Sequence, residues 1–100
     1  KFSFQKWTFI LMLEEKIIKE KKALGLRIFE LREKVINPKT NKPISQEELG
    51  LRTGNAKKTI GEIERGNTNP TFETLLKIAR ELQVSINELF QYNSNDYLRK

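Results

Sequence analysis

Two adjacent lysines, Lys57 and Lys58, are the side chains whose placement most directly indicates a chemical task. They fall in the first turn of a helix predicted over residues 56–65. The helix dipole favours acidic side chains in that turn, so each cation costs about 0.3–1 kcal/mol. Capping is also poor, because Asn55 can cap the helix but Ala56 cannot. Cations at this end of the helix therefore indicate an anionic partner, such as a phosphate group.

The predicted helix has one apolar face and one polar face. At about 100° per residue, Ala56, Ile60 and Ile63 fall within an arc of about 60° and are expected to face a core. The opposite arc, about 140° wide, holds a second set of residues: Lys57, Lys58, Gly61, Glu62 and Arg65. At Gly61 the absence of a side chain would let a surface approach the backbone closely.

The remaining reactive side chains do not form a catalytic or metal-binding set. The 100 residues include no cysteine and no histidine, which excludes disulfides, thiolate or imidazole metal sites and the commonest general base. Glu47, Glu48 and Glu64 are explained better by helix capping and ion pairing than by general acid–base catalysis. The sequence also has no glycine-rich phosphate loop and no nucleophile–base pair. We expect neither an enzyme nor a cofactor or metal.

Two short helices joined by a glycine turn must position the lysines. The segment Ser45–Glu48 predicts a capping box, in which the serine hydroxyl accepts from the Glu48 amide and the Glu48 carboxylate reaches back. The helix that begins there ends at Gly54, which takes the left-handed conformation at little cost. The second helix ends at Gly66, and Gly50 is small where the two helices would cross. This arrangement is typical of a helix-turn-helix.

Helical patterns also flank this pair. Apolar residues recur at helical spacing from Glu14 to Val35, and Gly25 predicts a division into a leader helix and a first core helix. The segment Asn37–Pro43 is a loop by composition. Thr71 caps a predicted helix to about Leu82, and Ser85–Glu88 is a second capping box that begins a short helix through Phe90.

Residues 1–13 leave several alternatives open. Trp7, Phe9, Leu11 and Leu13 alternate, which fits a short strand, a helix start that packs on a partner, or a disordered tail. In a further alternative, Met12 is the natural start and the preceding residues are an addition. The apolar run Phe9–Leu13 is far shorter than the ~18–20 residues that cross a bilayer, and no cleavage site follows it. We expect neither a membrane span nor a signal peptide.

The net charge of +6 is unevenly distributed. Residues 1–45 hold eleven Lys/Arg and five Glu, so 11 − 5 = +6, whereas residues 46–100 hold eight of each sign, so 8 − 8 = 0. The excess favours an anionic partner, although all of it lies upstream of the helix pair. The absence of cysteine fits a reducing cytoplasm.

Several short motifs occur in the order found in one known family. They are Arg27-Ile28…Leu31-Arg32, Ser45-Gln46-Glu47-Glu48-Leu49, Thr53-Gly54, Ile60…Ile63-Glu64-Arg65-Gly66, Asn69-Pro70 and Leu75-Leu76-Lys77-Ile78-Ala79…Leu82. Over about two thirds of the chain, Leu24 to Phe90, the sequence resembles the phage repressor and Cro-like helix-turn-helix family, also called the XRE family. The resemblance implies five helices, a recognition helix in the major groove, and binding as a homodimer to a two-fold symmetric site on double-stranded DNA.

The resemblance also implies roles for individual residues. The base-contacting residues would be Lys57, Lys58 and Glu62. The backbone-contacting residues would be Gln46, Thr59, Arg65, Asn67 and Thr68. Arg32 and Glu64 would form the internal ion pair that ties the first helix to the recognition helix. Because lysine suits guanine O6/N7 and glutamate can accept from cytosine N4, a half-site containing G·C pairs is expected.

The sequence departs from the family pattern at three places. The loop Asn37–Pro43 is longer than the family norm, so Lys39 and Lys42 are either exposed loop charges or an extra phosphate contact. Asn55 and Ala56 replace an apolar residue and a capping serine, so the sequence predicts the first residue of the recognition helix only to within one position. Gln83 replaces a glycine that often closes the fourth helix, at a cost of about 1 kcal/mol if it is left-handed.

We therefore expect an all-α protein: a compact five-helix, lambda-repressor-like helix-turn-helix bundle with an additional N-terminal segment. Its parts would be an extension (1–23), the DNA-binding domain (24–92) and a tail (93–100). The predicted core is Ile28, Leu31, Leu49, Ile60, Ile63, Phe72, Leu75, Ile78, Ala79, Leu82, Val84 and Leu89. Phe90, Tyr92, Tyr97, Leu98 and the N-terminal aromatics are candidate dimer contacts.

The leading functional hypothesis is a cytoplasmic, sequence-specific DNA-binding regulator of transcription, most simply a repressor. Within that class it could be a restriction-modification controller or an antitoxin with a toxin partner. The alternative is a protein-interaction module that keeps the fold without binding DNA, which the zero net charge of residues 46–100 favours.

Overall fold

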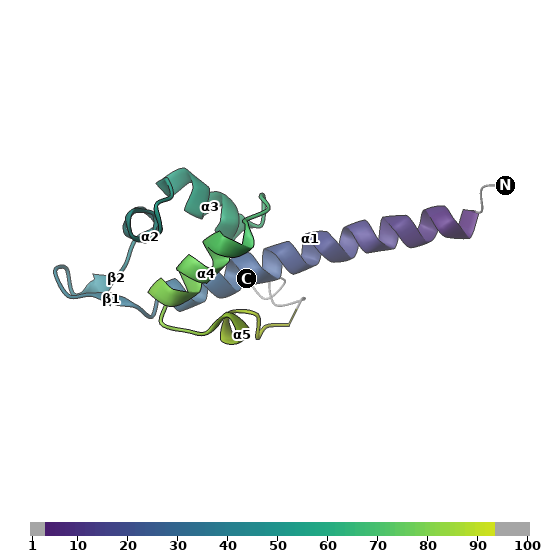
Figure 1. The fold of residues 1–100 in the computed structure, drawn as a ribbon. Helices are drawn as coiled ribbons and strands as arrows, with labels where there is room; N and C mark the ends of the chain where they lie inside the picture. The colour runs from purple at the N-terminus through teal and green to yellow at the C-terminus, as the bar shows by residue number, and fades with distance from the viewer. Residues whose placement is uncertain (1–3, 94–100) are drawn as a thin grey trace.

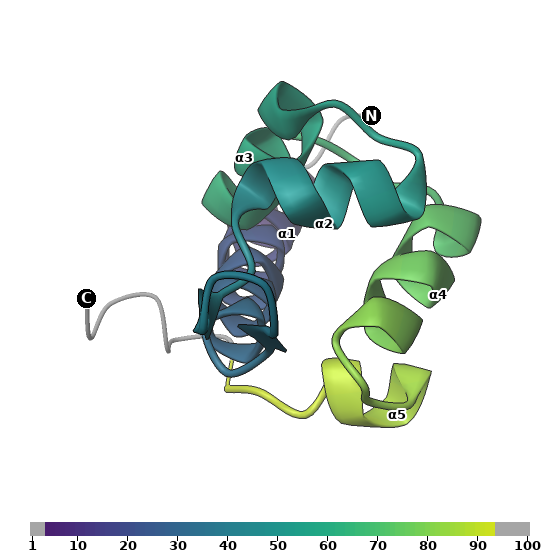
Figure 2. The same ribbon diagram turned by 90° about the vertical axis from the view of Figure 1, so that its left-hand side faces the viewer.

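The computed structural model describes residues 4–93 and shows the predicted all-α bundle. Its elements are α1 (Phe4–Arg32), β1 (Ile36–Asn37), β2 (Lys42–Pro43), α2 (Gln46–Thr53), α3 (Lys57–Arg65), α4 (Phe72–Glu81) and α5 (Ile86–Leu89) (Figure 1). In Figure 2, α2 runs across one end of the bundle, with α1 and α3 on one side and α4 and α5 on the other. Within these residues no helix is both long and apolar enough to span a membrane.

The first helix is longer than the sequence predicts. It runs unbroken over 29 residues, through Gly25, and its N-terminal half projects away from the other helices (Figure 1). The division at Gly25 is therefore wrong. A Cβ atom at Gly25 would lie 2.4 Å from the carbonyl oxygen of Glu64 and 2.6 Å from that of Ile63, so the glycine lets α3 approach α1 closely. The strand alternative is also wrong for Trp7–Leu13, because the chain is helical from Phe4 onwards.

The segment predicted as a loop between the first two helices contains a β-hairpin. Strands β1 and β2 pair antiparallel, with Ile36 opposite Pro43 and Asn37 opposite Lys42. The turn depends on Asn41, whose φ of 58° is one that asparagine adopts more readily than most residues. At the base of the hairpin, the amide of Ile44 donates to the carbonyl of Val35 over 2.8 Å, and both side chains are buried.

Each helix contributes to a single core. The largest fully buried side chains are Ile28, Ile44, Leu49, Ile60, Ile78 and Leu89, from the five helices and the end of the hairpin. Most of the predicted core is confirmed. Phe72 is the exception, because its side chain is 64% exposed. It is the first residue of α4 and lies outside the buried face formed by Leu75, Ile78 and Ala79. Val84 is only partly buried against the core, whereas Val35 and Ile44 are core residues that the prediction omitted.

Local capping explains where the later helices begin and end. Ser85 and Glu88 form the complete predicted capping box. At α2 only half of the predicted box forms: the Ser45 hydroxyl accepts from the Glu48 amide over 3.0 Å, but the Glu48 carboxylate accepts from Arg52 instead. After α4, Gln83 has a φ of 65°, so the left-handed conformation expected from the missing glycine is present.

Candidate nucleic-acid interface

The outer face of α3 is polar and accessible at its N-terminal end. Lys57, Lys58 and Thr59 are exposed, whereas Ile60 and Ile63 are buried on the opposite face. The helix begins at Lys57, one residue later than the predicted boundary at Ala56. Ala56 occupies the N-cap position without a side-chain hydrogen bond, and the first turn has no acidic residue. The backbone amides at this end and the two ammonium groups together form a positive helix terminus.

The turn between α2 and α3 depends on two glycines and one asparagine. A Cβ atom at Gly50 would lie 2.4 Å from the carbonyl oxygen of Asn55, so α2 and the start of α3 could not pack this closely with a larger residue. Gly54 ends α2 with a φ of 75°. The Asn55 side chain donates to the carbonyl and hydroxyl of Thr53. It therefore stabilises the end of α2 rather than capping α3.

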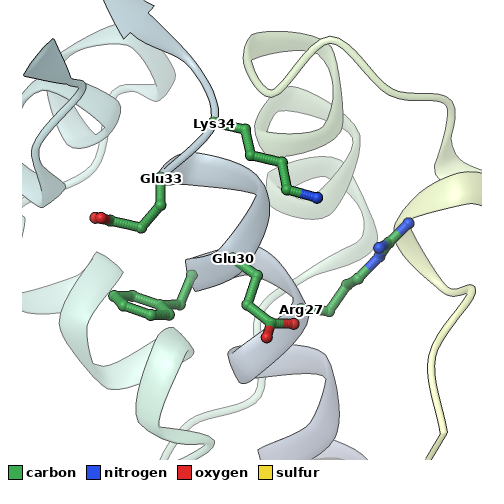
Figure 3. Close-up of a pocket in the computed structure, with 5 residues that line it drawn as sticks. Arg27, Glu30, Glu33 and Lys34 are labelled. Carbon is green, nitrogen blue, oxygen red and sulfur yellow. The ribbon is translucent and has the colours of Figure 1, made fainter.

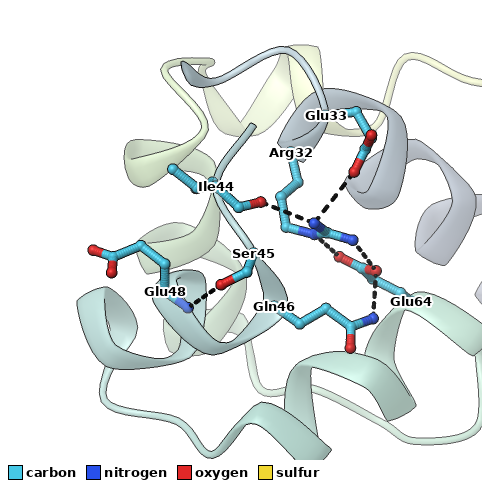
Figure 4. Close-up of polar contacts among 7 residues, drawn as sticks. All are labelled: Arg32, Glu33, Ile44, Ser45, Gln46, Glu48 and Glu64. Carbon is cyan, nitrogen blue, oxygen red and sulfur yellow. Dashed lines mark hydrogen bonds and ion pairs between the residues drawn. The ribbon is translucent and has the colours of Figure 1, made fainter. Parts of the chain in front are cut away.

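The structure brings Arg32 and Glu64 together in a buried, bidentate ion pair (Figure 4). Arg32 Nε lies 2.6 Å from Glu64 Oε2, and Arg32 Nη2 lies 3.0 Å from Oε1. Their side chains are only 8% and 5% exposed. Hydrogen bonding to Glu64 raises the pKa of Arg32 further above its ordinary value, against the opposing effect of burial. This pair fixes α3 on α1.

Two further groups complete the polar cluster around Glu64. The Gln46 side chain donates to Glu64 Oε1 over 2.9 Å, and Arg32 Nη1 donates to the Ile44 carbonyl over 2.9 Å (Figure 4). One carboxylate therefore links α1, α2 and α3, and the same guanidinium holds the end of the hairpin. The role of the Ile44 carbonyl was not predicted. The only sequence signal was an apolar residue directly before a helix cap.

Gly61 is not the open stretch of backbone that the sequence suggests. It is buried, and a Cβ atom there would lie 3.2 Å from Arg65 Nη1 and 3.4 Å from Gln46 Oε1. Two flexible side chains thus cover the middle of α3. Gln46, predicted to hold a phosphate, is half-buried and engaged with Glu64.

The C-terminal part of α3 carries an ion pair on its outer face. The Glu62 carboxylate, predicted to contact bases, accepts from the guanidinium of Arg65, predicted to contact the DNA backbone. Their side chains are 35% and 58% exposed. Beyond α3, Asn67 is exposed and Thr68 is half-buried. The residues predicted to contact DNA therefore all lie on α3, on the turn after it or at the start of α2.

Besides the α3 surface, a pocket and the acidic side chains of residues 4–93 are candidate sites for a small ligand or a metal ion. A pocket beside the C-terminal part of α1 is lined by Arg27, Phe29, Glu30, Glu33 and Lys34 (Figure 3). Its two cations and two carboxylates balance, so it favours neither an anion nor a cation. Within residues 4–93 no three His, Cys, Asp or Glu side chains are grouped to hold a metal ion. Among the predicted dimer contacts, Phe90 is 43% exposed, whereas Tyr97 and Leu98 lie outside the described residues.

Comparison with known proteins agrees with this geometry. A family model described as "Helix-turn-helix" matches residues 42–89, from β2 through α5. An uncharacterized HTH-type transcriptional regulator from Archaeoglobus fulgidus is 33% identical over 57 residues, which cover 57% of this chain and 80% of the relative. This chain belongs to the XRE-type helix-turn-helix family. Members of this family are DNA-binding transcription regulators and not enzymes.

A solved structure supports the assignment to the XRE-type family. The restriction-modification controller protein C.AhdI from Aeromonas hydrophila matches with a TM-score of 0.56 and 33% sequence identity. The match covers 73% of this chain and 94% of the controller chain. The XRE-type fold therefore accounts for most of the bundle.

Proposed function

We propose that this XRE-type protein is a cytoplasmic, sequence-specific repressor of transcription that binds a two-fold DNA operator as a homodimer. The observation that carries the proposal is the exposed pair Lys57 and Lys58 at the uncapped N-terminus of α3. Cations are unfavourable in that turn for the isolated protein and favourable beside phosphate and guanine. The ion pair between Arg32 and Glu64 supports the same role, because it holds α3 rigidly enough to enter a groove.

In this proposal α3 lies in the major groove. Lys57 and Lys58 donate to guanine O6 and N7, and Glu62 accepts from cytosine N4. Gln46, Thr59, Arg65, Asn67 and Thr68 contact the sugar–phosphate backbone, which sets the register of the protein on the duplex. Because Glu62 is paired with Arg65 in the free protein, DNA binding would exchange that pair for a base contact and a phosphate contact.

The proposed assembly follows from the size of one recognition helix. A single helix reads too few base pairs for useful specificity, so two copies would read half-sites one helical turn apart, about 34–36 Å. The likeness to a restriction-modification controller favours a controller of that kind as the regulatory role. The DNA-binding domain would comprise residues 24–92, preceded by the extension 1–23 and followed by the tail 93–100.

The double variant Lys57→Ala/Lys58→Ala tests the groove assignment. DNA selected by the wild-type protein from a random pool would be titrated over a salt series. We expect the logarithmic salt slope to flatten by about two units, because two cations no longer displace counterions. The control Lys77→Ala/Arg80→Ala also lowers the net charge from +6 to +4, but on α4. A slope equal to that of the control would remove the two lysines from the interface.

A second candidate function is binding of a protein partner such as a toxin. The projecting half of α1 favours it, because this half exposes seven large apolar side chains: Trp7, Phe9, Leu11, Met12, Leu13, Ile17 and Ile18. If the wild-type protein bound no DNA at any salt concentration while retaining its fold, this candidate would replace the first.

A further inference from the structure

The hairpin between α1 and α2 carries an unbalanced positive charge. From Lys34 to Ser45 the chain has three lysines and no acidic residue, so 3 − 0 = +3. Lys39 and Lys42 are exposed. Within residues 4–93, the ion pairs of the structure involve other cations, and neither lysine lies against a carboxylate. None of these ion pairs therefore offsets the charge of Lys39 and Lys42.

The hairpin is nevertheless ordered by its own hydrogen bonds. Asn37 accepts three bonds at the turn: its carbonyl accepts from the amides of Thr40 and Asn41 over 3.2 and 2.7 Å, and its side chain accepts from the Lys39 amide over 2.9 Å. The Lys42 amide donates to the Thr40 hydroxyl over 3.3 Å. A short, self-bonded turn presents its lysines with less loss of chain entropy on binding than a flexible loop would.

The hairpin is also tied to the recognition helix. Its base ends at Ile44, whose side chain is buried and whose carbonyl accepts from the guanidinium that holds Glu64 of α3 (Figure 4). Figure 1 shows the hairpin at the end of the bundle, from which the chain runs directly into α2. The direction of the hairpin relative to α3 is therefore set by a buried ion pair.

The start of α2 brings the hairpin close to the proposed DNA surface. Lys42 lies four positions before Gln46, so their Cα atoms are at most about 14 Å apart. A duplex carries one negative charge per about 1.7 Å of its axis. DNA held against α3 and the start of α2 therefore has phosphates within reach of a lysine side chain at the hairpin.

We propose that the hairpin Ile36–Pro43 is a second contact with the DNA backbone, in which Lys39 and Lys42 bind phosphates flanking those held by α3 and the start of α2. This proposal rests on the proposed function. The contact is sequence-independent: it adds affinity and helps to set the orientation of α3, while base discrimination stays with α3.

The variant Lys39→Ala/Lys42→Ala tests the hairpin contact. We expect its salt slope to be about two units flatter than that of the wild type, so that between 50 and 200 mM salt it loses about 16-fold less affinity. The affinity should fall equally for operator and random duplexes, because phosphates are common to both. Lys39→Arg/Lys42→Arg should keep the wild-type slope, since it retains both charges.

The control Lys77→Ala/Arg80→Ala has the same net charge and should keep the wild-type slope. A hairpin variant with that same slope would overturn the hairpin contact while leaving the proposed function intact. Absence of DNA binding by the wild-type protein would instead overturn the proposed function, and the hairpin contact with it. Circular dichroism of each variant would establish that both lysine substitutions leave the fold unchanged.

Discussion

At the scale of single residues, Glu64 is the group on which the helix-turn-helix depends. Its carboxylate accepts hydrogen bonds from Arg32 of α1 and Gln46 of α2. Such a buried pair contributes little net stability relative to an apolar pair, but loss of one partner leaves an uncompensated buried charge. Because loss of Glu64 would leave Arg32 as an unpaired buried charge, Glu64 determines whether α3 is held in one orientation on α1.

The variant Glu64→Gln is expected to lower the free energy of unfolding by about 3–5 kcal/mol. Glutamine has nearly the same shape, so the effect isolates the charge that balances Arg32. Urea denaturation would measure it. The control Lys77→Ala breaks a surface pair with Glu73, whose side chains are 47% and 78% exposed, and should cost less than about 1 kcal/mol. Equal effects of the two variants would contradict the structural role of Glu64.

At the scale of elements, the crossing of α1 and α3 explains a glycine in the interior of a long helix. Glycine normally weakens a helix by about 0.5–1 kcal/mol relative to alanine. At Gly25 that loss is offset, because the helix backbone lies directly against the C-terminal carbonyls of α3. Gly66, directly after α3, lies against Lys22 of α1 at the same crossing. A Cβ atom at Gly66 would lie 2.8 Å from the Cα atom of Lys22.

Two glycine-to-alanine variants should therefore have different effects on the free energy of unfolding. Gly25→Ala would place its Cβ 2.4 Å from a backbone oxygen, so we expect a loss of about 1–3 kcal/mol in the free energy of unfolding. Gly61→Ala would meet only the ends of two flexible side chains and should be neutral or stabilising by up to about 1 kcal/mol. Thermal and urea denaturation would measure both. A stabilising Gly25→Ala would contradict the close packing of the two helices.

At the scale of the whole molecule, a hydrogen bond joins the segment after α5 to the middle of α1. The Tyr92 hydroxyl donates to Glu20 of α1 over 3.1 Å, across 72 positions in sequence. Burial, followed by this bond to a carboxylate, raises the pKa of Tyr92 from 10.0 to about 12. The bond holds the segment after α5 against α1, from which the N-terminal half of that helix projects.

The titration of Tyr92 tests this contact. Because the pKa is raised in the folded protein, its contribution to stability is complete below pH 10 and is lost as the pH rises towards about 12. In a Tyr97→Phe background, Tyr92 is the single tyrosine, and its absorbance should change near pH 12. Adding Glu20→Gln should lower that midpoint towards 10, though not fully, because burial remains. An unperturbed midpoint near 10 would show that Tyr92 is not packed on α1.

The sequence alone determined the features that depend on neighbouring residues. Ser45, Thr71 and Ser85 marked the starts of three helices, and Gly54 marked the end of α2. The periodic apolar positions predicted most of the core. The order of short motifs, through the resemblance, predicted the family and the helix that would face DNA. Caps and helical periodicity are effects within one or two turns, so they can be seen in a linear pattern.

Only the tertiary structure decided which distant groups meet. It showed that Gly25 serves a helix crossing, that side chains of Gln46 and Arg65 cover Gly61, and that Phe72 lies outside the core. It also showed the hairpin and its attachment through Ile44 to the guanidinium that holds α3. These outcomes depend on packing between segments far apart in the chain, and the residue types alone permit more than one such arrangement.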